Sequence, residues 1–330
     1  MAAFDFCPIF GLLVIAFSSF LTLTCAGDLA LASHMRNGSL LPGVIPKTVI
    51  SSRLRLVYYV GVEGTGHHYF ADVFNSMFKA HSELQYVNSC DIGKMTYFPL
   101  MLGDVNGYNH SMEALRKELR VLADSEENLP EFGTIITVQR THPLQLTTCR
   151  NVHQLSFPNK YGPNKVQAHP DLRALTEISE EEGVDLRYLY LQRSAWDLIV
   201  SNTNHRQFHT FLQGRHVIDD RPVERMFLEY LHITLTNIAV LGSMLEEMGS
   251  EFIVCHKFDS MGDPIQAKAV AQFLAPSDKV ARYLESAILE SGESPGGERE
   301  ELLFEDAAVF VERLQKKLDT FEARICNFSW

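Results

Sequence analysis

Four short apolar runs, separated by helix-length stretches, constrain the fold of this chain more than any other feature. They cover residues 53–60, 134–138, 186–191 and 251–255, and β-branched, aromatic and leucine residues dominate them, as in buried strands. Strands that alternate with helices predict an α/β fold of three layers, with a central, mainly parallel sheet flanked by helices. In such folds ligands bind beyond the carboxyl ends of the strands, so the residues that follow each run are the first site candidates.

The stretches between these runs carry apolar residues at helical spacing or helix-start signals. The predicted helices cover about 70–81, 111–123 with Ser111 as N-cap, 170–183, 222–248 and the final segment 298–325. Residues 86–109 and 151–169 are rich in Gly, Pro and Asn and predict loops. We therefore expect residues 51–330 to form a single domain, with C-terminal helices from 276 onward packed on it.

The N-terminus predicts entry into the secretory pathway. Residues 7–26 contain no charged side chain, a length that suits a signal-peptide core or a type II signal anchor. Ala26 and Gly27 resemble a cleavage site, and both readings of residues 1–27 stay open. Residues 28–50 are expected to be a stem, and the protein is expected in the Golgi lumen or outside the cell, on a membrane only if the leader is uncleaved.

Charge, sequons and cysteines agree with this location. The net charge of −12 argues against nucleic acid as a partner, since that binding needs a basic surface. Three N-glycosylation sequons begin at Asn37, Asn109 and Asn327. An oxidising compartment permits disulfides, with the pairing open, among the four cysteines beyond the leader, Cys90, Cys149, Cys255 and Cys326. None has CxxC spacing, so no metal is expected.

The first site candidate is the turn GVEGTGHH, which follows the first run. A glycine-rich turn that leads from a strand into a helix points backbone N–H groups at a phosphate. The turn has no lysine, so it is not a Walker A loop. A tight turn without a ligand is the competing interpretation. Its candidate ligand-binding residues are Glu63, Gly64, Thr65, Gly66, His67 and His68.

Two further candidates follow the next runs. Arg193 lies just past the run 186–191, and Ser201 lies two turns along the helix predicted from Ala195, so both could hold one phosphate. Arg140 and His142 end the run 134–138, an arrangement that suits a base beside an anion-binding residue. If the sheet is parallel, these residues converge on one edge.

Together these motifs resemble the sulfotransferase family, in the family's chain order, over residues 53–275. The segment RSAWDLIVS, from Arg193 to Ser201, is similar to the family's RxxxDxxVS pattern, which binds the 3′-phosphate of the co-substrate 3′-phosphoadenosine 5′-phosphosulfate. Arg140-Thr-His142 is similar to the Lys-Thr-His segment that supplies the base. Phe258 and Asp259 fall in the places of a later Tyr-Glu pair. The long gap between His142 and Arg193 is similar to that of Golgi-type members.

The resemblance implies roles for these residues. The turn, Thr65 included, would hold the 5′-phosphosulfate, Arg193 and Ser201 the 3′-phosphate, and His142 would take the proton of an acceptor hydroxyl on a glycan or protein. Arg140 would neutralise the sulfonate. Gly64 stands where the family has Lys or Arg, so His67 or His68 would supply that donor. Glu63 is a competing base.

The missing lysine keeps other functions open. A sulfotransferase-like binding protein without turnover is one alternative, since losing one transition-state donor costs about 10²–10³ in rate. A P-loop kinase-like nucleotide enzyme is a second, although the turn lacks the Lys-Ser/Thr pair that holds phosphate and Mg²⁺. A secreted glycan-binding or adhesion module is the third, non-enzymatic alternative.

Overall fold

The computed structural model describes most of the predicted domain. The residues described are 54–61, 67–88, 105–124, 134–138, 159–161, 166–168, 171–204, 223–292 and 307–326. They belong to one compact unit that extends over Ile50–Trp330. The leader, the stem and the candidates Glu63, Gly64, Thr65, Gly66, Arg140 and His142 lie outside the described residues.

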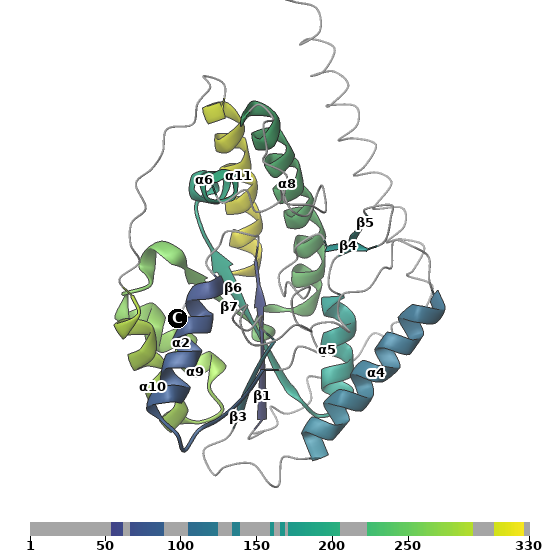
Figure 1. The fold of residues 1–330 in the computed structure, drawn as a ribbon, viewed down its shortest axis with the longest axis vertical. Helices are drawn as coiled ribbons and strands as arrows, with labels where there is room; N and C mark the ends of the chain where they lie inside the picture. Colours follow the sequence, from purple (N-terminus) through teal and green to yellow (C-terminus); the bar gives the residue numbers. More distant parts are fainter. Residues whose placement is uncertain are drawn as a thin grey trace, which may run out of the picture. The chain divides into compact units, whose positions relative to one another are not determined.

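A five-stranded parallel sheet forms the centre of this unit (Figure 1). Its strands are β1 (Leu54–Val60), β2 (Gln85–Asn88), β3 (Thr134–Val138), β6 (Asp185–Gln192) and β7 (Ile253–Lys257). Their order across the sheet is β2-β3-β1-β6-β7, so the first strand of the chain is the central one. The predicted α/β class with a parallel sheet and flanking helices is thus confirmed.

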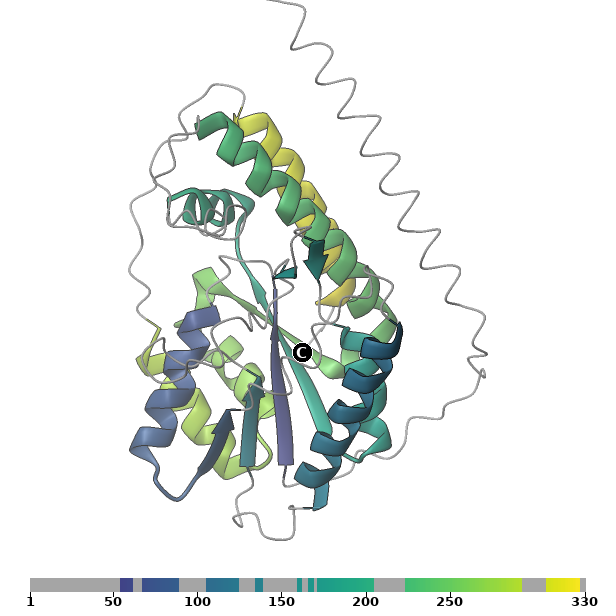
Figure 2. The ribbon, with the colours of Figure 1, turned by 45° about the vertical axis from the view of Figure 1, so that its right-hand side comes forward.

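Helices flank the sheet on both sides (Figures 1 and 2). On one side lie α2 (His67–Ala80), α9 (Pro264–Leu274) and α10 (Asp278–Glu290), and on the other α4 (Val105–Asp124) and α5 (Leu172–Glu181). The helices α6 (Ala195–Asn204), α8 (Val223–Met248) and α11 (Ala307–Ile325) pack on one another. Single 3₁₀ turns, η4 (Ser250–Phe252) and η5 (Phe258–Ser260), flank β7, and a short antiparallel hairpin joins β4 (Asn159–Tyr161) to β5 (Val166–Ala168).

The core explains why the apolar runs become strands. Every side chain of β1 except that of Arg55 is buried, as expected for a strand covered on both faces. The aromatic spacing of α2 places Phe70, Phe74 and Met77 in the core, where Phe70 and Phe74 pack against Tyr59 of β1. The burial of these apolar side chains is the main source of the fold's stability.

Several local predictions were wrong. The helix predicted from Ser111 begins six residues earlier, at Val105, and in its first turn the hydroxyl of Tyr108 donates a hydrogen bond to Asp171 (3.1 Å). The stretch predicted as a loop from residue 86 contains β2, and the loop predicted over 151–169 contains the β4–β5 hairpin. The last strand begins at Ile253, two residues late, because η4 precedes it.

Within the described part of the chain, no helix is long and apolar enough to cross a membrane. The predicted signal or anchor segment, residues 1–27, lies outside that part.

Candidate functional site

The carboxyl edge of the sheet has one point where neighbouring strands send the chain in opposite directions. From β1 the chain passes through α2 to β2 on one side, whereas from β6 it proceeds to β7 on the other. β1 and β6 are direct neighbours, with Val60 opposite Tyr190. Open α/β sheets bind ligands at such a switch point. Gly61 and Arg193, which directly follow these two strands, mark the place.

Arg193 is a half-buried cation at this edge. Its guanidinium carbon lies 4.5 Å from the centroid of the Phe258 ring in η5, a cation–π arrangement that holds the group against β7. Burial lowers the pKa of Arg193 from its ordinary value, and the carboxylates of Asp197 and Asp259 oppose this change. Arginine keeps its proton in such surroundings, so the guanidinium of Arg193 is positively charged beside these two carboxylates.

A local capping pattern fixes the helix that follows Arg193. Ser194 accepts a hydrogen bond from the backbone N–H of Asp197 (3.1 Å) and donates its own hydroxyl to the Asp197 carboxylate. The sequence Ser-x-x-Asp therefore begins α6 at Ala195, as predicted. The N–H of Ala195 donates to the side-chain oxygen of Gln315 in α11 (2.7 Å). The N–H groups of Ala195 and Asp197 are thus already engaged within the protein.

The remaining described candidates lie on the two helices that leave this edge. Ser201 is in α6, six residues or about 9 Å of helix rise beyond Ala195. His67 and His68 are the first two residues of α2, where the positive end of the helix dipole favours anions. The structure thus places the start of α2, Arg193 and the helix with Ser201 after neighbouring strands.

One buried residue at this edge escaped sequence analysis. His256 of β7 is 0% exposed, and its ring meets the edge of Phe70 in the first turns of α2, with 5.2 Å between ring centroids. Among the described residues neither ring nitrogen has a hydrogen-bond partner. Burial lowers the pKa of His256 to about 4, although Asp263 opposes this, so the imidazole is neutral. The only signal in the sequence was a histidine inside an apolar run.

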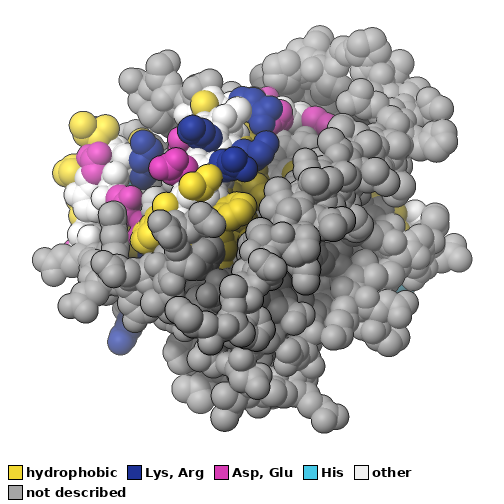
Figure 3. All heavy atoms as spheres, turned by 90° about the horizontal axis from the view of Figure 1, so that it is seen from above, with side chains coloured by type: hydrophobic (Ala, Val, Ile, Leu, Met, Phe, Trp, Pro, Cys, Tyr) yellow, Lys and Arg dark blue, Asp and Glu magenta, His cyan; other side chains and the backbone are white. Residues whose placement is uncertain are grey.

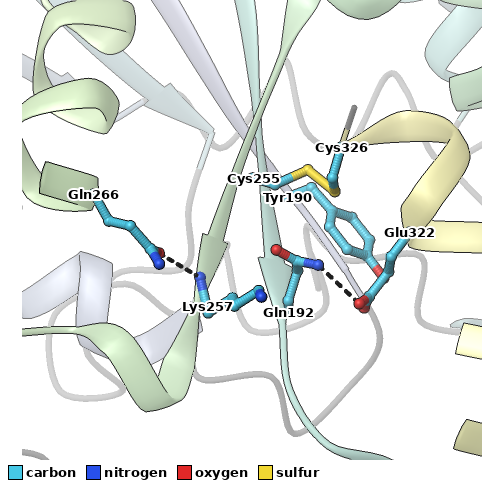
Figure 4. Close-up of a disulfide and its surroundings, with 7 residues drawn as sticks. All are labelled: Tyr190, Gln192, Cys255, Lys257, Gln266, Glu322 and Cys326. Carbon is cyan, nitrogen blue, oxygen red and sulfur yellow. Dashed lines mark hydrogen bonds between the residues drawn. A yellow bond between two sulfur atoms is a disulfide. The ribbon is translucent and has the colours of Figure 1, made fainter. Parts of the chain in front are cut away.

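A second missed cluster joins the end of β6 to α11 (Figure 4). The side chain of Gln192 donates to Glu322 (2.8 Å), and the hydroxyl of Tyr190 donates to the same carboxylate (3.3 Å). Burial raises the pKa of Glu322, while these two hydrogen bonds lower it. Beside the cluster, Cys255 and Cys326 form a disulfide, one of the pairings that the sequence left open.

The face seen from above carries no uniform charge among its described residues. Seen from above, Lys and Arg side chains gather among Asp and Glu side chains and apolar groups (Figure 3). Among the described residues no group of three or more His, Cys, Asp or Glu is arranged to hold a metal ion.

Comparison with protein-family models, with curated proteins and with solved structures found no match to this chain. Any function assigned to it therefore rests on its own residues and their arrangement.

Proposed function

We propose that this protein is a sulfotransferase that uses 3′-phosphoadenosine 5′-phosphosulfate to sulfate a hydroxyl group of a glycan or protein in the secretory pathway. The observation that carries this proposal is the position of Arg193. It is a half-buried cation directly beyond β6, at the switch point beside the turn that follows β1. The helix that follows it carries Ser201 at the spacing of the sulfotransferase phosphate motif.

The strand order supports a P-loop-like arrangement. The central strand β1 ends at Val60 and α2 begins at His67, so the chain leaves the sheet at the middle of the carboxyl edge before it enters α2. Backbone N–H groups at the start of α2 suit a 5′-phosphosulfate, and Arg193 suits the 3′-phosphate through paired hydrogen bonds. A nucleotide that bridges β1 and β6 would satisfy both.

The chemistry of this proposal is an in-line transfer. The bond between the sulfur and the bridging phosphate oxygen breaks, a bond between the sulfur and the acceptor oxygen forms, and His142 takes the acceptor proton. Such transfers depend on positioning and charge stabilisation. Arg140 and either His67 or His68 would stabilise the sulfonate, and Thr65 would bind phosphate. Glu63 is the alternative base.

The Cys255–Cys326 disulfide favours the proposed compartment, because structural disulfides persist in oxidising surroundings. It agrees with the apolar leader and the three sequons. Gly64, in place of a cation, favours one second candidate, a protein of the same fold that binds the nucleotide without turnover.

Nucleotide titration tests the proposal. The lumenal domain is heated with increasing 3′-phosphoadenosine 5′-phosphate, and with 5′-AMP, which lacks the 3′-phosphate. At 100 times the dissociation constant, binding stabilises the fold by about 2.7 kcal/mol, which raises the melting temperature. Arg193→Ala should abolish most of the shift from the bisphosphate, whereas Arg282→Ala, an exposed arginine of α10, should leave it intact. No shift with the wild-type protein would refute the proposal.

Turnover is then tested with His142→Ala. If His142 is the base, sulfate transfer falls by about 10²–10⁴ while nucleotide binding persists. Binding without any transfer by the wild-type protein would favour the second candidate, and a shift with Mg-ATP instead of the bisphosphate would favour a kinase-like enzyme.

A further inference from the structure

We propose that α11 is a brace that holds Arg193 in its binding geometry, and that Gln315 and Glu322 are its positioning residues. This inference rests on the proposed role of Arg193 in binding a 3′-phosphate. It assigns a task to a helix that carries none of the predicted ligand-binding residues.

The two contacts of the brace lie on either side of Arg193 in the chain. Glu322 accepts a hydrogen bond from Gln192, the residue immediately before Arg193 (2.8 Å). Gln315 accepts one from the N–H of Ala195, two residues after it (2.7 Å). Arg193 therefore lies in a short segment that α11 holds at both ends.

The spacing of the two positioning residues fits this segment. Gln315 and Glu322 are seven residues apart, so they lie on the same side of α11, separated by about 10 Å along its axis. The three residue steps from Gln192 to Ala195 span at most about 10 Å of extended chain. The two lengths are comparable, so both contacts can form at once from one side of α11.

α11 is itself well fixed. Its apolar stripe is buried and packs against α6 and α8, with Leu314, Leu318 and Phe321 at its centre. The ring of Phe321 meets that of Tyr190 edge-on, with 5.6 Å between centroids. The Cys255–Cys326 disulfide joins the end of α11 to β7, and Cys255 is the β7 residue opposite Tyr190. The disulfide and the Glu322 cluster thus attach α11 to the sheet at two paired residues, Cys255 and Tyr190 (Figure 4).

The first arm of the test needs no ligand. Gln315→Ala removes the acceptor for Ala195, whereas Gln315→Glu keeps one, and Glu312→Ala changes an exposed position of the same helix. Amide hydrogen exchange over residues 193–198 should become about fivefold faster in Gln315→Ala, as expected for the loss of one hydrogen bond, and stay unchanged in the other two variants. Equal exchange in Gln315→Ala and Gln315→Glu overturns the brace.

The second arm compares two nucleotides. Gln315→Ala and Glu322→Ala should weaken binding of 3′-phosphoadenosine 5′-phosphate about fivefold and leave that of 5′-AMP unchanged. When Arg193 is already replaced by alanine, the same substitutions should not weaken binding further, because the effects of substitutions at coupled residues are not additive. An equal loss for both nucleotides, or additivity with Arg193→Ala, would mean that α11 only supports the fold, and would overturn the positioning role.

The two arms separate this inference from the proposed function. If the wild-type protein binds neither nucleotide, the proposed function and the binding role of Arg193 both fail. The exchange measurement still decides, independently of any nucleotide, whether α11 holds the segment around Arg193. If Glu322→Ala does not fold, Gln315→Ala and Gln315→Glu decide both arms. A Cys255→Ser, Cys326→Ser double variant should show faster exchange over residues 193–198 in the same sense as Gln315→Ala.

Discussion

The two edges of the sheet differ in how their polar groups are satisfied. At the amino edge, Arg55 of β1 donates to Asp185 of β6 (3.0 Å from Nε) and to the backbone carbonyls of Phe273 and Ala275 (2.8 and 2.7 Å). The Nε atom of Arg187 lies 2.9 Å from Oδ1 of the same aspartate. This edge is a closed network that ties β1, β6 and the end of α9 together.

The carboxyl edge is arranged differently. Arg193 lies over the ring of Phe258 with carboxylates nearby, and His256 is buried without a hydrogen-bond partner among the described residues. Buried polar groups are normally satisfied, so an exception points to a role other than stability. One edge of this sheet thus carries an ion-pair network that stabilises the fold, whereas the other is the edge where we propose that the nucleotide binds.

The largest expected effect is the loss of the amino-edge network. Asp185→Ala leaves Arg55 and Arg187 without their shared carboxylate, with Arg55 only 12% exposed. Breaking a buried ion pair on one side costs about 3–5 kcal/mol of unfolding free energy, measurable by urea denaturation. Nucleotide affinity of the folded protein should not change.

The matched control is Glu181→Ala, which breaks the exposed pair with Arg116 between α5 and α4. Exposed pairs contribute at most about 1 kcal/mol. A similar loss in both variants would contradict the view that the amino edge is a special stabilising network.

His256 offers the next largest effect, at the other edge. Its pKa is about 4 in the folded protein, below the ordinary value of 6.5, because burial disfavours the charged ring. The unfolded chain therefore binds a proton that the fold excludes, so stability is lost as pH falls from about 6.5 to about 4, by about 3 kcal/mol in total. Urea denaturation at several pH values measures this loss.

His256→Leu should flatten that part of the pH profile, whereas His110→Gln, at an exposed histidine of α4, should leave it unchanged. A wild-type profile without this loss between pH 6.5 and 4 would show that the ring finds a partner when protonated, and the contrast between the edges would weaken.

The apolar runs predicted four of the five strands of the parallel sheet because burial on both faces leaves a strong signal in the sequence. The strand of this sheet that was missed, β2, is a short edge strand of four residues in a stretch with many loop-forming residues. The ends of α5 and α8 were predicted closely, since Pro and Gly residues mark them. Local chemistry was thus enough where an element carries its own start and stop signals.

The site was harder to predict where it depends on distant residues. Arg193 was found because it follows a strand directly, which is a local pattern. Glu322 and Gln315 were not, because their partners lie 130 and 120 residues away in the chain. His256 looked like any histidine in an apolar run, and only its packing against Phe70 reveals its burial. Contacts between remote elements leave no periodic signal in one sequence.

The smallest expected effect sharpens the comparison at the amino edge. Gly183, between α5 and β6, has φ of 75°, and its N–H donates to the carbonyl of Glu180 (3.2 Å) in a helix-ending turn. A Cβ at this position would meet nothing within 4 Å. Gly183→Ala should therefore lower the free energy of unfolding only by the strain of alanine in the left-handed conformation, about 1 kcal/mol. Gly183→Asn should lower the free energy of unfolding by less, because asparagine tolerates the left-handed conformation better. Gly262→Ala, whose Cβ would make only an ordinary contact at 3.8 Å, should cause no such backbone strain.

Denaturation measures the loss of unfolding free energy in each variant, and nucleotide affinity should be the same in all three. A change in affinity with Gly183→Ala would show that the amino edge influences the binding edge, and the division between them would fail.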